Sequence, residues 1–263
     1  MNFKGTAKRL DDVDLPKLGK ILGVGEDELH AFIDVETRGS GFDEQGRPRI
    51  LFERHKFYKY LPKSKRAEAV KAGLASTTAG GYGKESDQYP KLERAMKIDQ
   101  KAALYACSWG LGQIMGFNHA LAGYDTVEAM IESFKEDEEN HLASAVAFIK
   151  NTGLDDELRA HRWAAFAKGY NGVDYKRNRY DEKLAEAFRK WSRIKDTPPD
   201  APEPEIIVTE PPVAKPEPDV IVVQDNPKPS WKIPRGTKGL SILGAIIMAI
   251  FTWFSDYFSF FGG

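Results

Sequence analysis

The sequence predicts a mainly α, α+β domain with a small β segment, followed by a proline-rich linker and a C-terminal hydrophobic helix. Three observations lead to this prediction. Apolar residues return at three- and four-residue spacing through residues 1–195, which is typical of amphipathic helices. Eleven of the fifteen prolines lie in residues 197–234, where they prevent regular helix. Residues 239–263 are mostly apolar and carry one charged side chain, Asp256.

Composition limits the class of protein. A chain of 263 residues is long enough for one domain and an appendage. Its 38 basic and 39 acidic side chains give a net charge of -1, so we expect no nucleic-acid partner. Cys107 is the only cysteine, which excludes an intrachain disulfide, and we expect it to pack in an apolar helix. The five histidines are scattered without a zinc-binding pattern, so we expect neither a metal nor a cofactor.

Helical periodicity is clearest in three segments of the domain. The first is a predicted helix over Glu26–Thr37, and two further helices are expected near residues 127–134 and 184–191. Their apolar stripes are Leu29-Phe32-Ile33, Val127-Met130-Ile131-Phe134 and Leu184-Ala187-Phe188-Trp191. Glu36 lies on the same helix face as the first of these stripes.

A short β segment is predicted between the first two of these helices. Asp43-Glu44-Gln45-Gly46 is a turn signal, and the β-like run Arg49–Glu53 follows it. A small hairpin or a single strand is therefore expected there. Glycines cluster at residues 79–83, which predicts a loop, and again at residues 110–116, which are too glycine-rich for a long helix. Segments of the latter kind often line clefts.

Glu36 is the best candidate for acid chemistry. Cleaving a glycosidic bond requires a proton donor, and a carboxyl group stays protonated near neutral pH when it is partly shielded from water. Glu36 shares the apolar stripe of its predicted helix, and Gly39 and Gly41 then turn the chain away. Position alone is weak evidence, because an isolated glutamate at a helix end is more often a solvated surface residue.

Two downstream motifs strengthen this interpretation. They are Ser108-Trp109-Gly110-Leu111-Gly112-Gln113-Ile114-Met115 and Tyr170-Asn171-Gly172. A glutamate that closes a helix, followed by these motifs in this order, resembles the goose-type lysozyme and soluble lytic transglycosylase superfamily. The run from Glu36 to Phe57 looks more narrowly like the N-acetylmuramidase domain of phage endolysins. The resemblance covers about residues 10–193.

The resemblance implies a lysozyme-like fold with a cleft between two lobes, peptidoglycan glycan strands as substrate, and Glu36 as catalytic acid. It also implies that Ser108, Gln113, Tyr170 and Asn171 contribute to substrate binding. Gln113 offers an amide for an N-acetyl group or a sugar hydroxyl. Tyr170 could hydrogen-bond the carboxyl of Glu36 and present its ring to a sugar, while Asn171 suits a turn that holds the pair in place. Alternatively, the second motif is a plain turn.

The sequence departs from the transglycosylase pattern at two positions. Thr37 stands where a serine often follows the catalytic glutamate, and Gly116 replaces a common proline. The expected activity is therefore hydrolysis of the β-1,4 bond between N-acetylmuramic acid and N-acetylglucosamine, in a phage or prophage endolysin that lyses the host. The alternatives are a lytic transglycosylase, which forms a 1,6-anhydro product, and an inactive peptidoglycan-binding module.

A hydrolase needs a second group that positions water, and Asp43, Glu44 and Glu53 follow Glu36 in the sequence. Glu53 is preferred, because it ends the β-like run and its neighbours Arg54 or His55 could hold it ionised. The alternative is that Glu53 forms a structural salt bridge with an arginine.

Other signals are interpreted as structural. Glu138-x-x-His141 has the spacing of half a di-iron site but no second copy, so the acidic run around Glu138 is interpreted as a solvated helix face. Trp109 and Trp163 are expected in the core rather than as sugar platforms.

The expected organisation is an N-acetylmuramidase domain at 1–195, an extended linker at 196–235 and a hydrophobic membrane anchor at 236–263. The N-terminus has no apolar signal-peptide region. Basic residues precede the apolar tail, so the positive-inside rule predicts an enzyme held at the inner face of a bacterial membrane, with a holin as a possible partner. An interfacial or oligomerising tail and a packed soluble helix are the alternatives. The basic residues are Lys232, Arg235 and Lys238.

Overall fold

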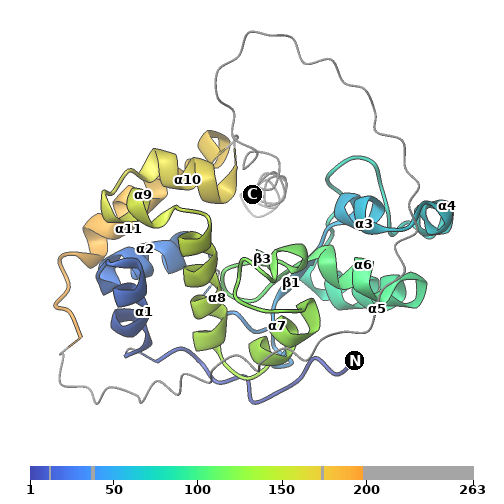
Figure 1. Cartoon of the computed structure of the whole chain (residues 1–263), viewed down its shortest axis with the longest axis horizontal. Coiled ribbons are helices and arrows are strands. Elements are labelled where there is room, and N and C mark those ends of the chain that lie inside the picture. The colour runs from blue at the N-terminus through green and yellow to red at the C-terminus, as the bar shows by residue number, and fades with distance from the viewer. Residues whose placement is uncertain (12, 37–38, 173–174, 198–263) are drawn as a thin grey trace, which may run out of the picture.

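The computed structural model describes residues 1–197, apart from 12, 37–38 and 173–174. This part of the chain is mainly helical with one small antiparallel sheet, which confirms the predicted fold class in its main features (Figure 1). The α-helices are α1 (Asp14–Leu22), α2 (Glu26–Glu36), α3 (Arg54–Tyr60), α4 (Lys63–Lys71), α5 (Gln88–Ile98), α6 (Gln100–Tyr105), α7 (Val127–Phe134), α8 (Glu138–Asn151), α9 (Asp155–Arg159), α10 (Trp163–Asn171) and α11 (Tyr180–Trp191). The strands are β1 (Ile50–Phe52), β2 (Cys107–Trp109) and β3 (Ile114–Met115), and the 3-10 helices are η1 (Glu85–Asp87), η2 (Gly116–Asn118) and η3 (Tyr175–Asn178).

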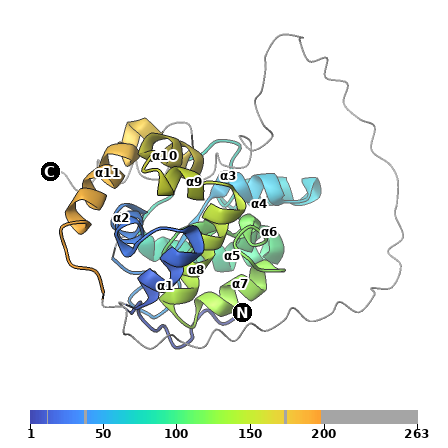
Figure 2. The same ribbon diagram turned by 60° about the vertical axis from the view of Figure 1, so that its left-hand side comes forward.

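The helices form two groups on either side of the sheet. Helices α1, α2, α9, α10 and α11 lie on one side, α3 to α6 lie on the other, and α7 and α8 stand between them (Figure 1). The view turned by 60° keeps α11 beside α2 and α10 beside α11 (Figure 2), and these pairs are in contact. The sheet and α8 therefore connect the two groups.

All three predicted apolar stripes fall within helices. Leu29 and Phe32 of α2 are fully buried, as are the apolar positions of α7. Leu184 and Ala187 of α11 are buried as well. Trp109 has no exposed surface, and its indole Nε1 donates to the Leu104 carbonyl at 3.1 Å, which confirms the core interpretation. Trp163 is partly buried against the same core.

The sheet is larger than the sequence predicted. Strand β1 was expected, but it pairs with β2, which in turn pairs with β3, both antiparallel. Strands of two or three buried residues are too short for a two-residue period to be recognised, so their sequence carries no strand signal. The prediction that Cys107 packs in a helix is wrong: it lies buried in β2 opposite Phe52. The predicted hairpin around the 43–46 turn is reduced to one bridge between Phe42 and Pro48.

The N-terminal segment packs against parts of the chain that are distant in sequence. Phe3 is buried, with ring contacts to Tyr89 at 5.2 Å and to Trp109 at 5.9 Å between centroids. Further along, the Ala7 amide donates to the Lys135 carbonyl at 3.0 Å. The segment therefore adds to the core before the first helix begins.

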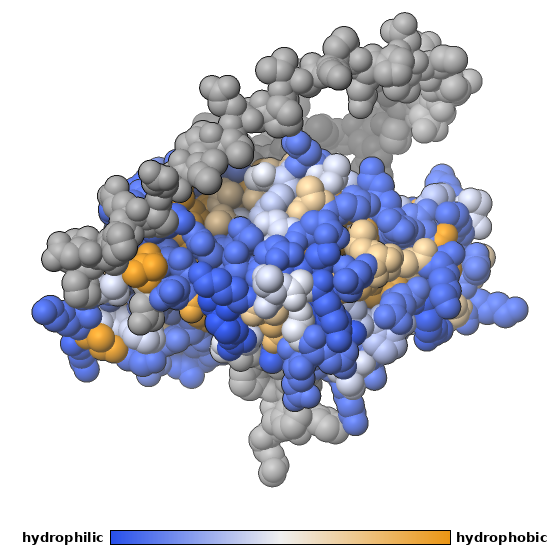
Figure 3. All heavy atoms as spheres, turned by 90° about the horizontal axis from the view of Figure 1, so that it is seen from below, coloured by the Kyte–Doolittle hydropathy of each residue, from blue (hydrophilic) through white to orange (hydrophobic). Residues whose placement is uncertain are grey.

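The surface seen from below is mainly hydrophilic, with apolar residues in small separate groups (Figure 3). No helix within the described residues is long and apolar enough to span a membrane. The predicted linker and hydrophobic tail lie almost wholly outside the described residues.

Candidate active site

Glu36 is the last residue of α2, and only 4% of its surface is exposed. Burial raises the pKa of its carboxyl from 4.5 to about 7, because the charged form loses its hydration. A hydrogen bond from Asn171 and the positive charge of Lys183 lower the pKa, but by less than burial raises it. Glu36 is therefore half protonated near neutral pH, which is suited to donating a proton.

Asn171 is the direct partner of Glu36. It is the last residue of α10, and Gly172 then leaves the helix with φ of 90°, a conformation that favours glycine. The Asn171 amide nitrogen donates to both carboxyl oxygens of Glu36, at 2.9 and 3.0 Å. The ends of two helices that are far apart in sequence thus meet at the acid.

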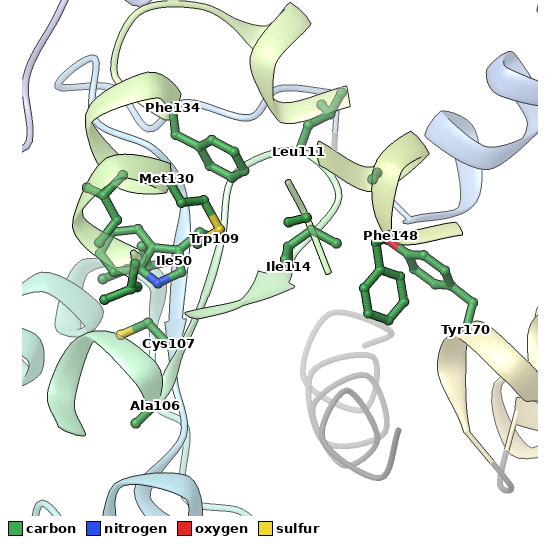
Figure 4. Packing of buried hydrophobic residues seen from close by; sticks show 14 of the residues in the cluster. Ile50, Ala106, Cys107, Trp109, Leu111, Ile114, Met130, Phe134, Phe148 and Tyr170 are labelled. Carbon is green, nitrogen blue, oxygen red and sulfur yellow. The ribbon is translucent and has the colours of Figure 1, made fainter. Parts of the chain in front are cut away.

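The contacts of Tyr170 differ from those that were predicted. Its hydroxyl donates to the Gly112 carbonyl at 3.0 Å, and its ring is fully buried. Phe148 lies beside it, with ring centroids 5.7 Å apart (Figure 4). The predictions that Tyr170 hydrogen-bonds Glu36 and presents its ring to a sugar are therefore wrong. Consecutive helical residues point about 100° apart, so only one of this pair faces Glu36, and it is Asn171.

Gln113 lies in the tight turn between β2 and β3. Its backbone adopts a left-handed conformation with φ of 48°, and its side chain is held at both ends. The Ser108 hydroxyl donates to the Gln113 carbonyl oxygen at 2.7 Å, and the Gln113 amide nitrogen donates to the Gly110 carbonyl at 2.8 Å. Ser108 itself is buried, whereas Gln113 is half-buried. Of these two side chains, that of Gln113 is thus the more exposed.

Glu53 is buried directly after β1, before α3 begins. Its Oε2 lies 3.2 Å from Nε2 of His55. Burial raises the pKa of Glu53 above its usual value, whereas the positive charge of Lys56 lowers it, and burial lowers the pKa of His55 to about 4. The nearby charge that favours the ionised form of Glu53 is thus that of Lys56, rather than that of Arg54 or His55 as the sequence predicted. Within the described residues, the group at salt-bridge distance from Glu53 is this histidine, and not the arginine that the alternative interpretation predicted.

The turn that carries Gln113 is linked, through residues adjacent in sequence, to the neighbourhoods of both Glu36 and Glu53. Tyr170 holds this turn and precedes Asn171, the partner of Glu36. On the other side, Ser108 pairs with Leu51 in the sheet, two residues before Glu53.

Three residues near the site were missed or misread in the sequence. Lys183 of α11 acts on Glu36 through its charge, and no motif marks it. Glu138 and His141 are both buried, so the interpretation as a solvated helix face is wrong. The i, i+3 spacing of these two residues was the sequence signal that could have identified them. The described residues contain no group of three or more His, Cys, Asp or Glu side chains that could hold a metal ion.

A mainly helical domain with a small sheet and a shielded, proton-bearing glutamate at a helix end has the features of a lysozyme-type glycosidase. The chain belongs to the N-acetylmuramidase family, whose model matches residues 26–192. It is also similar to the crystal structure of the Burkholderia AP3 phage endolysin, with 38% sequence identity, a TM-score of 0.66, and coverage of 71% of this chain and 73% of that one. A comparison with curated proteins finds no match. The protein is a peptidoglycan-cleaving glycoside hydrolase.

Proposed function

We propose that the domain cleaves the β-1,4 bond between N-acetylmuramic acid and N-acetylglucosamine, with Glu36 as the general acid. The observation that carries this proposal is the burial of Glu36, which raises its pKa to about 7. The leaving sugar oxygen needs a proton as the bond breaks, and a carboxyl group that is protonated near neutral pH can supply it.

The Glu36→Gln variant tests this assignment, because the amide keeps the shape and loses the transferable proton. Release of muropeptides from purified sacculi should fall by on the order of 10²–10⁴. Glu26→Gln is the matched control: Glu26 is a buried glutamate at the opposite end of the same helix, and its variant should keep activity. Near-normal release by folded Glu36→Gln protein would refute the assignment.

The remaining site residues would bind substrate directly or support those that do. Gln113 would contact an N-acetyl group or a sugar hydroxyl, since each end of its amide retains hydrogen-bonding capacity beyond its one protein contact. Ser108 and Tyr170 would fix Gln113 and its turn, and Asn171 would orient the carboxyl of Glu36.

Glu53 is the proposed second carboxylate. To activate water it must be ionised, whereas burial favours its neutral form. Activity that depends on Glu53 should therefore decline as pH falls and the carboxyl becomes protonated. Glu53→Gln should then lose activity and keep its melting temperature. A large loss of melting temperature, with unchanged activity per folded molecule, would instead identify a structural pair with His55.

Product analysis separates hydrolysis from the transglycosylase alternative. Mass spectrometry of released muropeptides should show reducing-end N-acetylmuramic acid. A dominant 1,6-anhydro product would mean that the sugar's own 6-hydroxyl attacks, with Glu36 acting as acid and then as base.

The biological role proposed here is that of a phage or prophage endolysin, supported by the likeness to a phage endolysin. The apolar tail at 236–263 would anchor the enzyme to the inner membrane through the linker at 196–235. Lys232, Arg235 and Lys238 precede this tail and favour placing the enzyme on the cytoplasmic side. Access to the cell wall would then require a lesion in the membrane, such as one made by a holin.

A further inference from the structure

Helix α8 buries two polar side chains one turn apart, Glu138 and His141. Glu138 is 3% exposed and His141 has no exposed surface. Burying such groups is unfavourable unless hydrogen bonds replace those made with water. Residues spaced i, i+3 share one face of a helix, so both side chains reach toward the same region of the molecule.

Glu138 receives hydrogen bonds from two separate loops. Its Oε1 accepts from the Gly41 amide at 2.7 Å and from the Ser40 hydroxyl at 2.9 Å. Its Oε2 accepts from the Leu10 amide at 3.0 Å, and Nη1 of Arg9 lies 3.3 Å from Oε1. A charged acceptor with these partners fixes the backbone of both loops more firmly than a neutral one would.

His141 connects two further segments through its two ring nitrogens. Nδ1 accepts from the Leu111 amide at 3.1 Å, and Nε2 donates to the Phe134 carbonyl at 2.6 Å. Because an amide N–H can only donate and a carbonyl can only accept, these partners require the neutral ring with its proton on Nε2. Burial supports this form by lowering the pKa of His141 to about 4. The ring also packs closely against the backbone of Gly110, where an added Cβ would lie 2.8 Å away.

These contacts reach the segment that follows Glu36 and the turn that carries Gln113. Gly41 belongs to the segment that follows Glu36 at the end of α2. Leu111 belongs to the tight turn that carries Gln113, two residues further on. A helix keeps a fixed rise of about 1.5 Å per residue, so the separation of Glu138 and His141 on α8 is constant.

We propose that Glu138 and His141 are positioning residues that hold the Glu36 segment and the Gln113 turn at a fixed separation. This inference rests on the proposed function of Glu36 and Gln113. Neither residue takes part in proton transfer. Each acts through the backbone it binds, so its loss should lower kcat more than it raises KM. A displacement of about 1 Å in such a site can reduce the rate about 10²-fold.

A pair of histidine variants tests the contact with Leu111. Asparagine places its amide near the position of Nδ1, whereas glutamine places it near Nε2. His141→Asn should therefore retain most of kcat, while His141→Gln should lose about 10-fold to 100-fold, although both variants lower the melting temperature. Hydrogen exchange of the Leu111 amide, which does not depend on activity, should be faster in His141→Gln than in His141→Asn. Equal kcat and equal exchange in the two variants would overturn the role of His141.

Glu138 is tested by rescue. Glu138→Ala should lose kcat at temperatures well below its melting point, and Glu138→Gln should restore part of it, because an amide oxygen can still accept from Gly41. Val146→Ala is the matched control: Val146 is buried in the same helix, and its truncation should lower stability without changing kcat. If Glu138→Ala behaves like this control, the role of Glu138 is refuted.

Assays of wild type and Glu36→Gln run beside these variants separate the two proposals. Normal activity of Glu36→Gln would refute the proposed function, whereas the exchange of the Leu111 amide would still report on the His141 contact. If Glu36→Gln is inactive and the α8 variants follow stability alone, only the positioning role fails.

Discussion

Glu36 and Asn171 show how two opposing influences set one pKa. Burial disfavours the charged carboxylate, and the amide of Asn171 stabilises it through two hydrogen bonds. Burial prevails, but the hydrogen bonds limit the rise, so the pKa of Glu36 lies near 7. With a much higher pKa the acid would transfer its proton less readily, and with a normal pKa it would be ionised at neutral pH.

The raised pKa of Glu36 also predicts how stability depends on pH. The folded protein binds this proton more tightly than the unfolded chain, whose glutamate has a pKa of 4.5. The resulting stabilisation is fully present below pH 4.5 and is lost as pH rises through about 7. Glu36→Gln removes the ionisable group, so the variant should gain stability over wild type as pH rises, by about 3 kcal/mol above pH 8.

Urea unfolding of wild type and Glu36→Gln between pH 4 and pH 9 measures this difference. The gap between the two stabilities should widen across the interval from pH 4.5 to 7. A gap that stays constant over the whole range would show that Glu36 has an ordinary pKa in the folded protein.

At the scale of elements, the site depends on a turn between two very short strands. Strand β3 has two residues and leads directly into η2, whose first residue is Gly116. A Cβ at Gly116 would overlap the carbonyl group of Leu104 in α6, with the carbonyl carbon at 2.9 Å. The glycine that replaces a common proline of the transglycosylase pattern therefore has a local structural reason, because α6 leaves no space for a side chain.

Gly116→Ala should accordingly destabilise the domain by about 1–3 kcal/mol, the usual range for overpacking a buried position. Thermal unfolding measures this loss. Gly25→Ala is the control, because the nearest atom to its added Cβ is a side-chain oxygen of Glu28 at 3.3 Å rather than a backbone group. A melting temperature of Gly116→Ala equal to that of the control would mean that α6 and η2 can separate without loss.

At the scale of the molecule, the groups of the site come from both sides of the sheet. Glu36 and Asn171 belong to the group of helices that contains α2 and α10, and Glu53 precedes α3 on the other side (Figure 1). The Gln113 turn and α8 lie between them. A substrate that contacts both carboxyl groups would therefore span the two groups of helices.

Membrane anchoring is a prediction for the whole chain. The full-length protein should sediment with membranes and resist extraction with alkaline carbonate, because residues 239–263 are long enough to cross a bilayer. A chain that ends at Thr197 should remain in the supernatant and still release muropeptides from sacculi. Recovery of the full-length protein in the supernatant without detergent would reject the anchor and leave the enzymatic assignment intact.

The sequence by itself determined the features that local patterns encode. Helical periodicity predicted α2, α7 and α11, since an apolar stripe is a property of a short stretch of chain. The position of Glu36 at the end of α2 and the order of the three motifs were equally local, and they led to the family to which the chain belongs.

Only the tertiary structure decided which groups meet. Strands β2 and β3 exist through pairing with distant residues, and the choice of Asn171 over Tyr170 as the partner of Glu36 depends on how α10 is rotated against α2. The burial of Glu138 and His141 depends on loops that approach α8 from elsewhere in the chain. Burial and hydrogen bonding set the pKa of a carboxyl group, and both arise from residues far apart in sequence that come together only when the chain folds.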